Sequence, residues 1–490
     1  MGNWLDNLIG FISPEAGYER AAWRQSLDEM RNYDAGDYGR LNSHWRAINE
    51  SAEYTDRGSR DIVRARARDL ERNSDIANSV IGAYKRNVVG AGYNLQARTG
   101  DEELNQKIEQ LWKKWTKKIN CDVTATQSFN QIMRMIERRK KVDGGILIHK
   151  VFTTGGLLPF KLQCLEVDEL DTSQTTPRKK GNRVIGGIEI NEFNRAEGYW
   201  IKQYDLEGMN LSQSVYIEAK DMIFVFTKDR PSQVREMSDL APTVSRIRDT
   251  NEFMTAVSVK ERIAACLSVF IKQNTPGLGG RNGILDSGEK KYNYNGKTLT
   301  PGMIKYLNPG DEVETVNPAG QATDATSFVK LQQRMIGAGQ GISYEATSRD
   351  MSESNYSSAR QGMIEDDLTY IEDKEEAMEV ADEIYETFMI SAVLAGQLEI
   401  TDFWRNKDKY MNHEWIQEPR RWIDPAKESN ANKIALQTGQ KTFKQISAES
   451  GRDWRDQIDD MAEVMEYAKQ KGVEIGGVMG YGQAATDTKK

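Results

Sequence analysis

Asn295 to Thr298 is the stretch whose residue types come closest to a catalytic motif. Its residues, Asn-Gly-Lys-Thr, match the end of a phosphate-binding loop, in which backbone N–H groups hold phosphates and a lysine reaches toward them. The full motif, GxxxxGKS or GxxxxGKT, needs a glycine five positions before Gly296, and that position is Lys291. The motif is therefore broken, and a tight turn between two short strands explains Asn295-Gly296 more simply.

The sequence supports a metal site or a catalytic triad no better than it supports a phosphate-binding loop. The histidines stand alone, without an HExxH pattern and without a cysteine or aspartate at ligand spacing. The sequence contains no GxSxG elbow, and its cysteines have no histidine close in sequence, although a pair formed by the fold stays open. We therefore expect no catalytic residue, no metal site and no cofactor. The residues concerned are His44, His149, His413, Cys121, Cys164 and Cys266.

Glycine and cysteine spacing exclude two further classes. Gly337, Gly339 and Gly341 match only a fragment of a dinucleotide-binding fingerprint, and they follow an expected helix rather than a strand. The cysteines lie more than forty residues apart and form no CxxC pair, so the sequence encodes neither a disulfide framework nor a zinc ribbon. This usage predicts a reducing cytosol as the compartment.

The composition is polar for a chain of 490 residues. Hydrophobic residues make up 38%, charged residues 29%, and the mean hydropathy is -0.67, so much of the chain faces water or polar partners. No stretch approaches the roughly 18 apolar residues that a spanning helix needs, and the best candidate, Val257 to Ile271, is interrupted by three charges. We therefore expect no membrane association, and the N-terminus does not fit a secretory signal.

Charge is distributed unevenly along the chain. The net charge of -8 argues against a protein whose main task is to grip nucleic-acid phosphates. Eleven acidic residues face only Arg360 and Lys374 between Ala359 and Glu386, a local net charge of -9. Basic clusters are interleaved with acidic and apolar residues, and we interpret them as solvated helix faces or subunit salt bridges rather than a phosphate track. These clusters are Arg57 to Arg72, Lys113 to Lys118 and Arg138 to Lys141.

The first half of the chain predicts a helix-rich α+β region. Residues 1 to 90 have helical periodicity, and the apolar stripe between Trp4 and Ile12 fits either a docking arm or a helix packed on its own domain. From Gly90 to Phe226, short β-branched or apolar runs predict strands. These runs are Gly145 to Phe152, Phe160 to Leu165, Val184 to Ile190, Tyr199 to Tyr204 and Met222 to Phe226.

Long helices dominate the second half. A helix is expected from Asp239 to Lys272, and a second one runs from about Ser327 until the three glycines stop it. Between them lies a Gly- and Asn-rich insert with short strand-like pieces at Met303 to Leu307 and Glu312 to Val316. Ser343 to Asn355 is a polar segment without a clear hydrophobic periodicity. A third helix, capped by Ser357 or Ser358, extends to about Leu394, and helix returns from Lys427 to Lys471.

Several segments together resemble the lambda-type family of portal proteins from tailed bacteriophages. Each match is weak alone, but their shared order over residues 30 to 440 makes the resemblance specific. Glu236 departs from the family pattern, which usually has glycine at the position that follows Arg235. Phe224 stands where the family often has histidine. The matching segments are Tyr33 to Ala35, Asn42 to Trp45, Asn73 to Gln96, Gln163 to Asp171, Arg230 to Arg235, Ile342 to Arg360 and Trp415 to Glu428.

The resemblance implies a portal fold and a ring, usually a homododecamer, at one vertex of the capsid. Through its channel the terminase large subunit would package double-stranded DNA without sequence specificity, and the tail would later release that DNA. Further implied partners are the major capsid and scaffolding proteins and the head-completion and tail adaptor proteins. The implied location is the virion, after assembly in the host cytoplasm.

The family's subdomains can be placed on this chain. The resemblance implies a wing of arm plus α+β body, two stem helices, a small α/β clip, a channel loop, a wing helix with its return, and a helical crown with a flexible tail. In this order the ranges are 1–238 for the wing, 239–272 and 327–341 for the stem, 273–326 for the clip, 342–356 for the channel loop, 357–424 for the wing helix and 425–490 for the crown and tail.

Two segments carry the expected contacts. The channel loop would meet DNA through small polar and mixed-charge side chains that allow only transient contact, although an ordinary surface connection has the same composition. Its residues are Ser348, Arg349, Asp350, Met351, Ser352, Glu353, Ser354 and Asn355. The clip would dock the terminase and later the adaptors, and the charges we would test there are Lys290, Lys291 and Lys305.

Two rival functions have to be weighed against a portal. A terminase-like nuclease or ATPase needs a complete phosphate loop or a metal-binding carboxylate cluster, and the loop is broken at Lys291. Another capsid-associated structural or scaffolding protein would share the composition but not the order of the matching segments. The acidic helix also suits a conduit, because like charge keeps a duplex from adhering to it within about 10 Å in physiological salt.

Overall fold

The computed structural model describes residues 11–29, 48–203, 213–265, 269–273, 311–315, 324–417 and 425–473. The chain divides into a small unit, residues 1–55, and a large unit, residues 56–490. The small unit contains α2 (Pro14–Glu29), and α3 (Ala52–Asp56) spans the boundary. Most of the apolar stripe between Trp4 and Ile12 lies outside the described residues.

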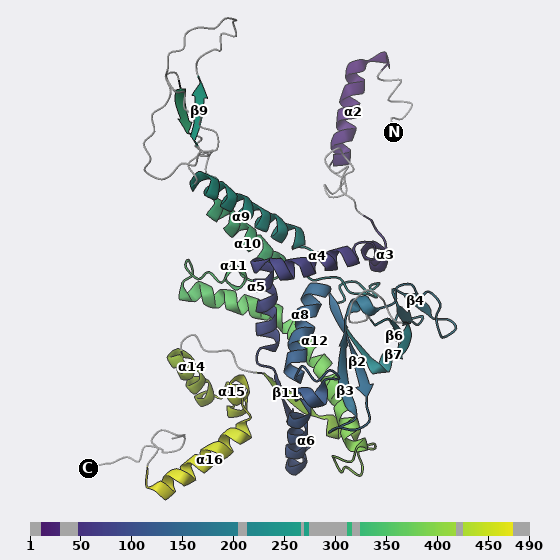
Figure 1. The fold of residues 1–490 in the computed structure, drawn as a ribbon, viewed down its shortest axis with the longest axis vertical. Coiled ribbons are helices and arrows are strands. Elements are labelled where there is room, and N and C mark those ends of the chain that lie inside the picture. Colours follow the sequence, from purple (N-terminus) through teal and green to yellow (C-terminus); the bar gives the residue numbers. More distant parts are fainter. Residues whose placement is uncertain are drawn as a thin grey trace, which may run out of the picture. The chain divides into compact units, whose positions relative to one another are not determined.

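Helices open the large unit, as the sequence predicts (Figure 1). Helix α4 (Arg60–Asn73) is followed at once by α5 (Asp75–Tyr84), because Ser74 ends one and caps the other through its side chain, which accepts from the N–H of Ala77 at 3.3 Å. A π-helical turn, η2 (Lys85–Val89), then ends at Gly90, whose φ is 55°.

Three helices lie between Gly90 and Gly145, where the sequence indicated helix only at the basic clusters Lys113 to Lys118 and Arg138 to Lys141. They are α6 (Glu102–Trp115), α7 (Lys118–Cys121) and α8 (Phe129–Asp143). Helix α8 ends at Gly144, where φ is 89° and an added Cβ would lie 2.4 Å from the backbone of Met237. Only glycine fits this close approach between α8 and the chain that leads to α9 (Val244–Ala265).

The strands form small antiparallel sheets. Strands β2 (Gly145–Phe152), β3 (Phe160–Leu165) and β8 (Met222–Phe226) occupy the predicted ranges and lie in the order β3-β2-β8. The second sheet has the order β4-β5-β6-β7. Its strands are β4 (Arg183–Ile185), β5 (Ile188–Ile190), β6 (Ala196–Ile201) and β7 (Val215–Glu218), and short 3-10 turns η3 (Val167–Glu169) and η4 (Ala219–Asp221) border the sheets.

Two strand predictions were wrong in detail. The run from Val184 to Ile190 is two strands, because Gly186 and Gly187, with φ of 56° and 86°, turn the chain between them. The strand expected at Tyr199 to Tyr204 begins at Ala196 and ends at Ile201. The pair of β1 (Tyr93–Ala97) and β11 (His413–Gln417) was not predicted, because its strands lie more than 300 residues apart.

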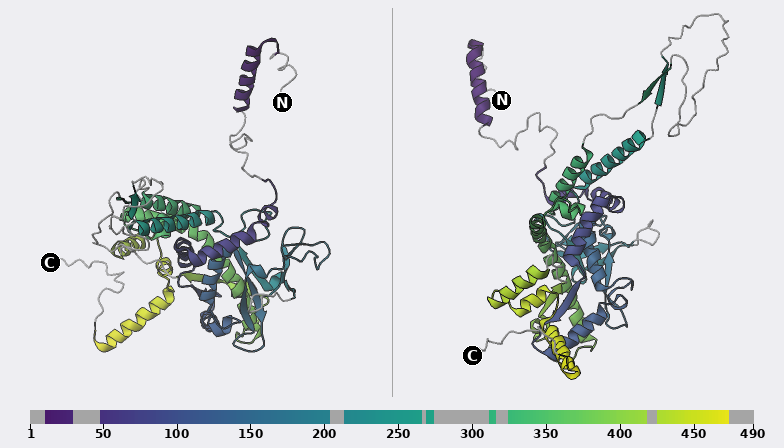
Figure 2. Two further views of the ribbon diagram at one scale, coloured as in Figure 1. Left: turned by 45° about the horizontal axis from the view of Figure 1, so that its top comes forward. Right: turned by 90° about the vertical axis from the view of Figure 1, so that its left-hand side faces the viewer.

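Helices α9 and α10 (Ala325–Gly339) lie side by side (Figures 1 and 2). The rings of Phe253 and Phe328 meet at 4.5 Å between centroids. The predicted first helix is too long at both ends, because turns precede Val244 and the chain becomes strand β9 (Val269–Gln273), paired with β10 (Asp311–Thr315). The latter confirms the strand expected at Glu312 to Val316, while Met303 to Leu307 and the rest of the insert lie outside the described residues.

The glycines at the end of α10 act differently from the prediction. Gly337 and Gly339 are helical, and the helix ends at Gly339, while Gly341 has φ of 68°. Helix α12 (Tyr356–Leu394) is capped by Asn355, whose side chain accepts from the N–H of Ser358 at 2.8 Å, so Ser358 is the third residue of the helix rather than its cap. The remaining helices are α11 (Tyr344–Ser348), α13 (Lys407–Met411), α14 (Pro425–Gln437), α15 (Phe443–Glu449) and α16 (Trp454–Lys471).

Aromatic packing anchors the carboxyl-terminal half of α12. Trp115 of α6 stacks on Phe160 of β3 at 5.3 Å, and Trp112 meets Phe388 of α12 edge to face at 4.9 Å. Phe388 is fully buried. The amino-terminal half of α12 is different, because Ile364, Leu368 and Ile371 remain 42% to 58% exposed.

Candidate functional site

The segment expected to line a channel, residues 342–356, contains one turn of helix rather than an irregular loop. Ser343 caps α11, with its side chain accepting from the N–H of Ala346 at 3.2 Å. The backbone N–H and the hydroxyl of Ser343 both donate to Asp366 of α12, at 2.6 Å and 2.7 Å. The beginning of the segment is therefore held against α12.

The polar side chains after α11 bond mainly to one another. The N–H of Asp350 donates to Ser348, and the N–H of Ser352 donates to Asp350, at 3.1 Å and 3.0 Å. Ser354 donates its hydroxyl to Glu345 of α11 at 2.6 Å. These internal contacts leave fewer hydroxyls to meet a passing duplex than the composition suggests.

An ion pair joins the segment to the second long helix. Lys330 of α10 lies 2.6 Å from Glu353, and Arg334 lies 3.8 Å from the same carboxylate. Arg349 ends α11 with φ of 60°, and its side chain is exposed, as are Met351, at 56%, and Asn355. Arg349 and Met351 are therefore the long side chains that this segment presents to its surroundings.

A pocket of about 400 Å³ lies between η2, α11 and the amino-terminal half of α12. Arg86, Met351 and Met363 are among its lining residues. Burial lowers the pKa of the Arg86 guanidinium, and the positive charge of Arg349 lowers it further. Sequence reasoning did not single out Arg86, because it is one arginine in a helical stretch and no local pattern marks its approach to Arg349.

Most acidic side chains of the acidic helix, α12, make contacts within the fold. Asp373 of α12 pairs with Lys140 and Lys141 of α8, at 2.5 Å and 2.9 Å, and Glu383 pairs with Lys150 of β2 at 2.6 Å. Other acids of α12 reach different elements, namely Glu376 to Lys140, Asp382 to His413 and Trp415, and Glu386 to Lys407. The expectation of an acidic face that repels DNA was therefore too broad, because these carboxylates neutralise cations of the same chain.

Lys141 connects three elements. Its ammonium lies 3.0 Å from Asp239, which precedes α9, 2.9 Å from Asp373 of α12, and 3.8 Å from the centre of the Tyr84 ring. Glu137 lies one turn earlier on α8 and is 3% exposed, and its Oε1 has no hydrogen-bond partner within the described residues. Burial raises the pKa of Glu137 to about 8, and the charge of Asp373 adds to this effect.

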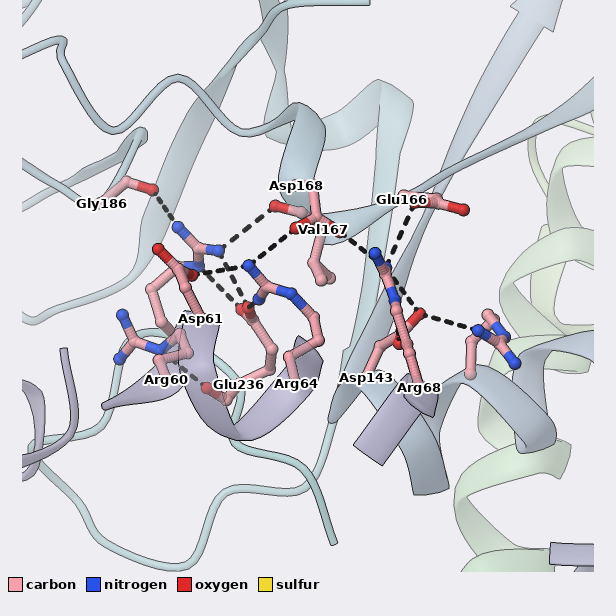
Figure 3. Close-up of polar contacts among 12 residues, drawn as sticks. Arg60, Asp61, Arg64, Arg68, Asp143, Glu166, Val167, Asp168, Gly186 and Glu236 are labelled. Carbon is pink, nitrogen blue, oxygen red and sulfur yellow. Dashed lines mark hydrogen bonds and ion pairs between the residues drawn. The ribbon is translucent and has the colours of Figure 1, made fainter. Parts of the chain in front are cut away.

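The arginines of α4 form a second buried network (Figure 3). Arg64 lies 2.9 Å from Glu236 and 2.9 Å from Asp168, while Arg68 lies 2.7 Å from Asp143. Glu236 is fully buried, and Arg235 beside it pairs with the same carboxylate at 2.7 Å. Arg60, Arg64 and Arg68 of the basic cluster therefore contribute to folding, whereas Arg57, Arg66 and Arg72 are exposed, as expected of a solvated helix face.

This network explains the departure from the family pattern at Glu236. The Nε of Arg60 donates to the carbonyl oxygen of Glu236 at 2.8 Å, and the guanidinium of Arg235 donates to the carbonyl oxygen of Gly186 at 2.6 Å. A carboxylate at position 236 satisfies two buried guanidinium groups that would otherwise be costly. The network joins α4 to the turn between β4 and β5.

Other kinds of site have no support in the part of the chain that the structure describes. No group of three or more His, Cys, Asp or Glu side chains there could hold a metal ion. No helix in those ranges is long and apolar enough to cross a membrane. Lys290, Lys291 and Lys305 lie outside the described residues.

Comparison with known proteins decides the family. The model of the family described as phage portal protein, lambda family, matches residues 38–372. The chain belongs to this family. It is 26% identical over 457 residues to a probable portal protein of Halomonas phage phiHAP-1, which covers 90% of this chain and 88% of the relative. It is 21% identical over 473 residues to portal protein B of Escherichia phage lambda, covering 88% and 89% of the two chains.

Solved structures with a similar chain include two gene transfer agent particles. The neck of an empty particle, computed with C6 symmetry, gives a TM-score of 0.46 at 12% identity and covers 84% of this chain and 98% of that chain. The neck of a native particle, computed with C12 symmetry, gives a TM-score of 0.43 at 12% identity, with coverages of 77% and 90%.

Membership of the lambda portal family confirms the resemblance recognised in the sequence. The protein is therefore a phage portal protein with a connector function, and its place is in the virion. The helix-rich α+β class is confirmed as well. The portal family is structural, and nothing in the comparisons indicates catalysis.

The network around Glu236 makes the first testable prediction for this portal protein. Replacing Glu236→Gln removes the carboxylate that Arg64 and Arg235 share, and we expect the free energy of unfolding to fall by about 3–5 kcal/mol. Chemical denaturation followed by circular dichroism measures this change. The matched control is Glu218→Gln, whose carboxylate pairs with Lys220 at the surface and should leave the midpoint unchanged. Equal midpoints for the two variants would contradict a stabilising role for the network.

Glu137 predicts a pH dependence. The unfolded carboxyl group loses its proton near pH 4.5, whereas the folded group keeps it up to about pH 8, so this residue makes the protein less stable as pH rises between these values. Each pKa unit corresponds to about 1.4 kcal/mol. We expect Glu137→Gln, which cannot titrate, to gain stability relative to wild type between pH 5 and pH 8.5.

Thermal unfolding at both pH values tests this expectation. Glu399→Gln, an exposed glutamate after α12, serves as the control and should change stability equally at the two pH values. A difference between Glu137→Gln and wild type that is the same at pH 5 and pH 8.5 would show that Glu137 is already ionised in the folded protein.

Proposed function

We propose that this portal protein forms a ring, usually of twelve copies, at one vertex of the capsid, with an open axial channel for double-stranded DNA. The observation that most supports this ring is the order of elements in a chain of the lambda portal family. The helix pair α9 and α10 is followed directly by α11 and the long helix α12. The terminase large subunit would package DNA through the channel without sequence specificity, and the tail would later release it.

The subdomains of the family are proposed for this chain as follows. The α+β body around the sheets belongs to the wing, the pair α9 and α10 to the stem, the insert with β9 and β10 to the clip, and residues 342–356 to the channel segment. Helix α12 returns to the wing, and α14 to α16 belong to the crown. An insert between two adjacent helices projects from the body, which suits docking of a partner.

The proposed ring has partners of several kinds and no catalytic step of its own. Major capsid and scaffolding proteins would hold it during assembly in the host cytoplasm, and head-completion and tail adaptor proteins would bind it after packaging. The protein is proposed as a passive conduit, without nucleotide hydrolysis or DNA cleavage, because the phosphate-loop motif is broken at Lys291.

The channel segment carries a prediction about DNA. Replacing residues 352–354 by glycines keeps the chain length and leaves Arg349 and Met351 in place, but removes the exposed side chains of Ser352 and Glu353 and the hydroxyl of Ser354. Because Ser343 still holds α11 against α12, we expect rings of normal mass. The DNA retained per particle should fall, which gel electrophoresis of extracted genomes measures.

The control separates anchoring from DNA contact. Lys330→Gln combined with Glu353→Gln breaks the 2.6 Å ion pair to α10 while leaving the other side chains of the segment in place, and it should retain DNA as wild type does. Full retention in the glycine variant would show that residues 352–354 have no effect on DNA.

The clip carries a prediction about docking. Lys290, Lys291 and Lys305 are the cations that we propose to contact the packaging motor and later the adaptors. Reversing all three to Glu should weaken binding of the terminase large subunit in a pull-down and reduce packaging, because opposite charges attract across such contacts. Reversal of Lys113 and Lys114, at the end of α6, is the control. Unchanged binding after the clip reversal would place the contact elsewhere in the insert.

A further inference from the structure

The amino-terminal half of α12 has two unlike faces. Asp366, Tyr370 and Lys374 recur at helical spacing on the face that lines the pocket beside η2. Ile364, Leu368 and Ile371 recur at the same spacing about half a turn away, and they are 48%, 58% and 42% exposed. We call these three residues the apolar stripe. The same helix therefore presents a pocket on one side and exposed hydrophobic side chains on the other.

Acidic side chains accompany the apolar stripe. Glu365, Glu372 and Glu375 are exposed on the same side of α12, and none of them makes an ion pair within the described ranges. This separates them from Asp373, Glu376 and Glu383, which pair with lysines of α8 and β2. A hydrophobic row with a charged border is typical of a protein–protein contact surface.

The pocket side carries an arginine without a carboxylate partner among the residues that the structure describes. Arg86 lines the pocket, and Arg349 is close enough to disfavour its charged form. Two carboxylates that line the same pocket are already engaged, because Asp366 accepts twice from Ser343 and Glu345 accepts from Ser354. Arg86 has no ion-pair partner in the part of the chain that the structure describes. Met351 and Met363 add apolar surface at this side.

We propose that the apolar stripe and its glutamates on one copy of this chain pack against the Arg86–Arg349 side of α12 on the next copy. The proposal rests on the ring proposed above, since a closed ring requires two different and complementary patches on each subunit. Charge complementarity selects a second copy as the occupant, because one face of α12 offers carboxylates beside aliphatic side chains and the other offers guanidinium groups beside methionines. Arg86 then gains a carboxylate partner from the neighbour.

Two leucines on α12 give a matched test of the apolar stripe. Leu368 is 58% exposed within the stripe, and Leu394 is 69% exposed at the far end of the same helix. Size-exclusion chromatography with light scattering measures the mass of the assembled protein. We expect Leu368→Lys to lose the ring and run as smaller species, while Leu394→Lys keeps the mass of wild type.

A charge exchange tests the direction of the contact and guards against misfolded variants. Arg86→Glu alone and Glu372→Arg alone should each reduce the amount of ring, and the double variant should regain it, because the pair is restored with reversed signs. Restoration by a second change shows that each single variant is folded. Failure of the double variant to regain the ring, with normal circular dichroism, would overturn the contact.

Crosslinking provides an independent readout. Leu368→Cys combined with Met351→Cys, treated with a short bismaleimide, should give a ladder of covalent oligomers, because the proposed contact brings position 368 of one copy to position 351 of the next. Each single cysteine variant should remain monomeric on the denaturing gel. Wild-type rings of normal mass without a ladder in the double variant would overturn this interface and leave the ring in place, whereas a wild-type chain that forms no ring would contradict the proposed function itself.

Discussion

Buried ion pairs between α8 and α12 determine how the other parts of this portal protein are held. Lys140 and Lys141 are 3% and 7% exposed, and two ammonium groups so deep in the protein need carboxylates close by. Asp373 meets both of them, and Asp239 meets Lys141. Because Asp239 precedes α9 and Asp373 lies in α12, this cluster holds the start of α9 and the middle of α12 against α8.

The halves of α12 have different surroundings on either side of this cluster. Toward its carboxyl end, Phe388 and Tyr385 pack among Trp112, Trp115 and Phe160, and the helix is part of the core. Toward its amino end, the helix keeps hydrophobic side chains exposed and is joined to α11 through Ser343 and Asp366. Helix α12 therefore connects a well-packed core with a surface that exposes hydrophobic side chains.

Part of this arrangement could be predicted from local sequence. Strands β2, β3 and β8 match their predicted ranges because alternating or continuous apolar runs of five to eight residues carry enough information to define them. The family could be recognised from segments such as Arg230 to Arg235, and the structure shows why this stretch is informative, since Arg235 and Glu236 lie at the centre of a buried network. By contrast, the exposed acids and the ion-paired acids of α12 have the same residue types and spacing. The sequence therefore does not distinguish between them.

The sequence by itself therefore determined the helix-rich α+β class, the main strands, the absence of a complete phosphate-loop motif and the family. Tertiary structure alone decided which charges are structural and where β1 and β11 pair. The physical reason is the separation along the sequence over which each interaction acts. Periodicity and turn preference act over a few residues. Lys141, by contrast, pairs with Asp373 more than 200 positions away, and Tyr93 pairs with Gln417 more than 300 positions away. Such pairings depend on the whole fold, because each buried charge takes its partner from a distant element.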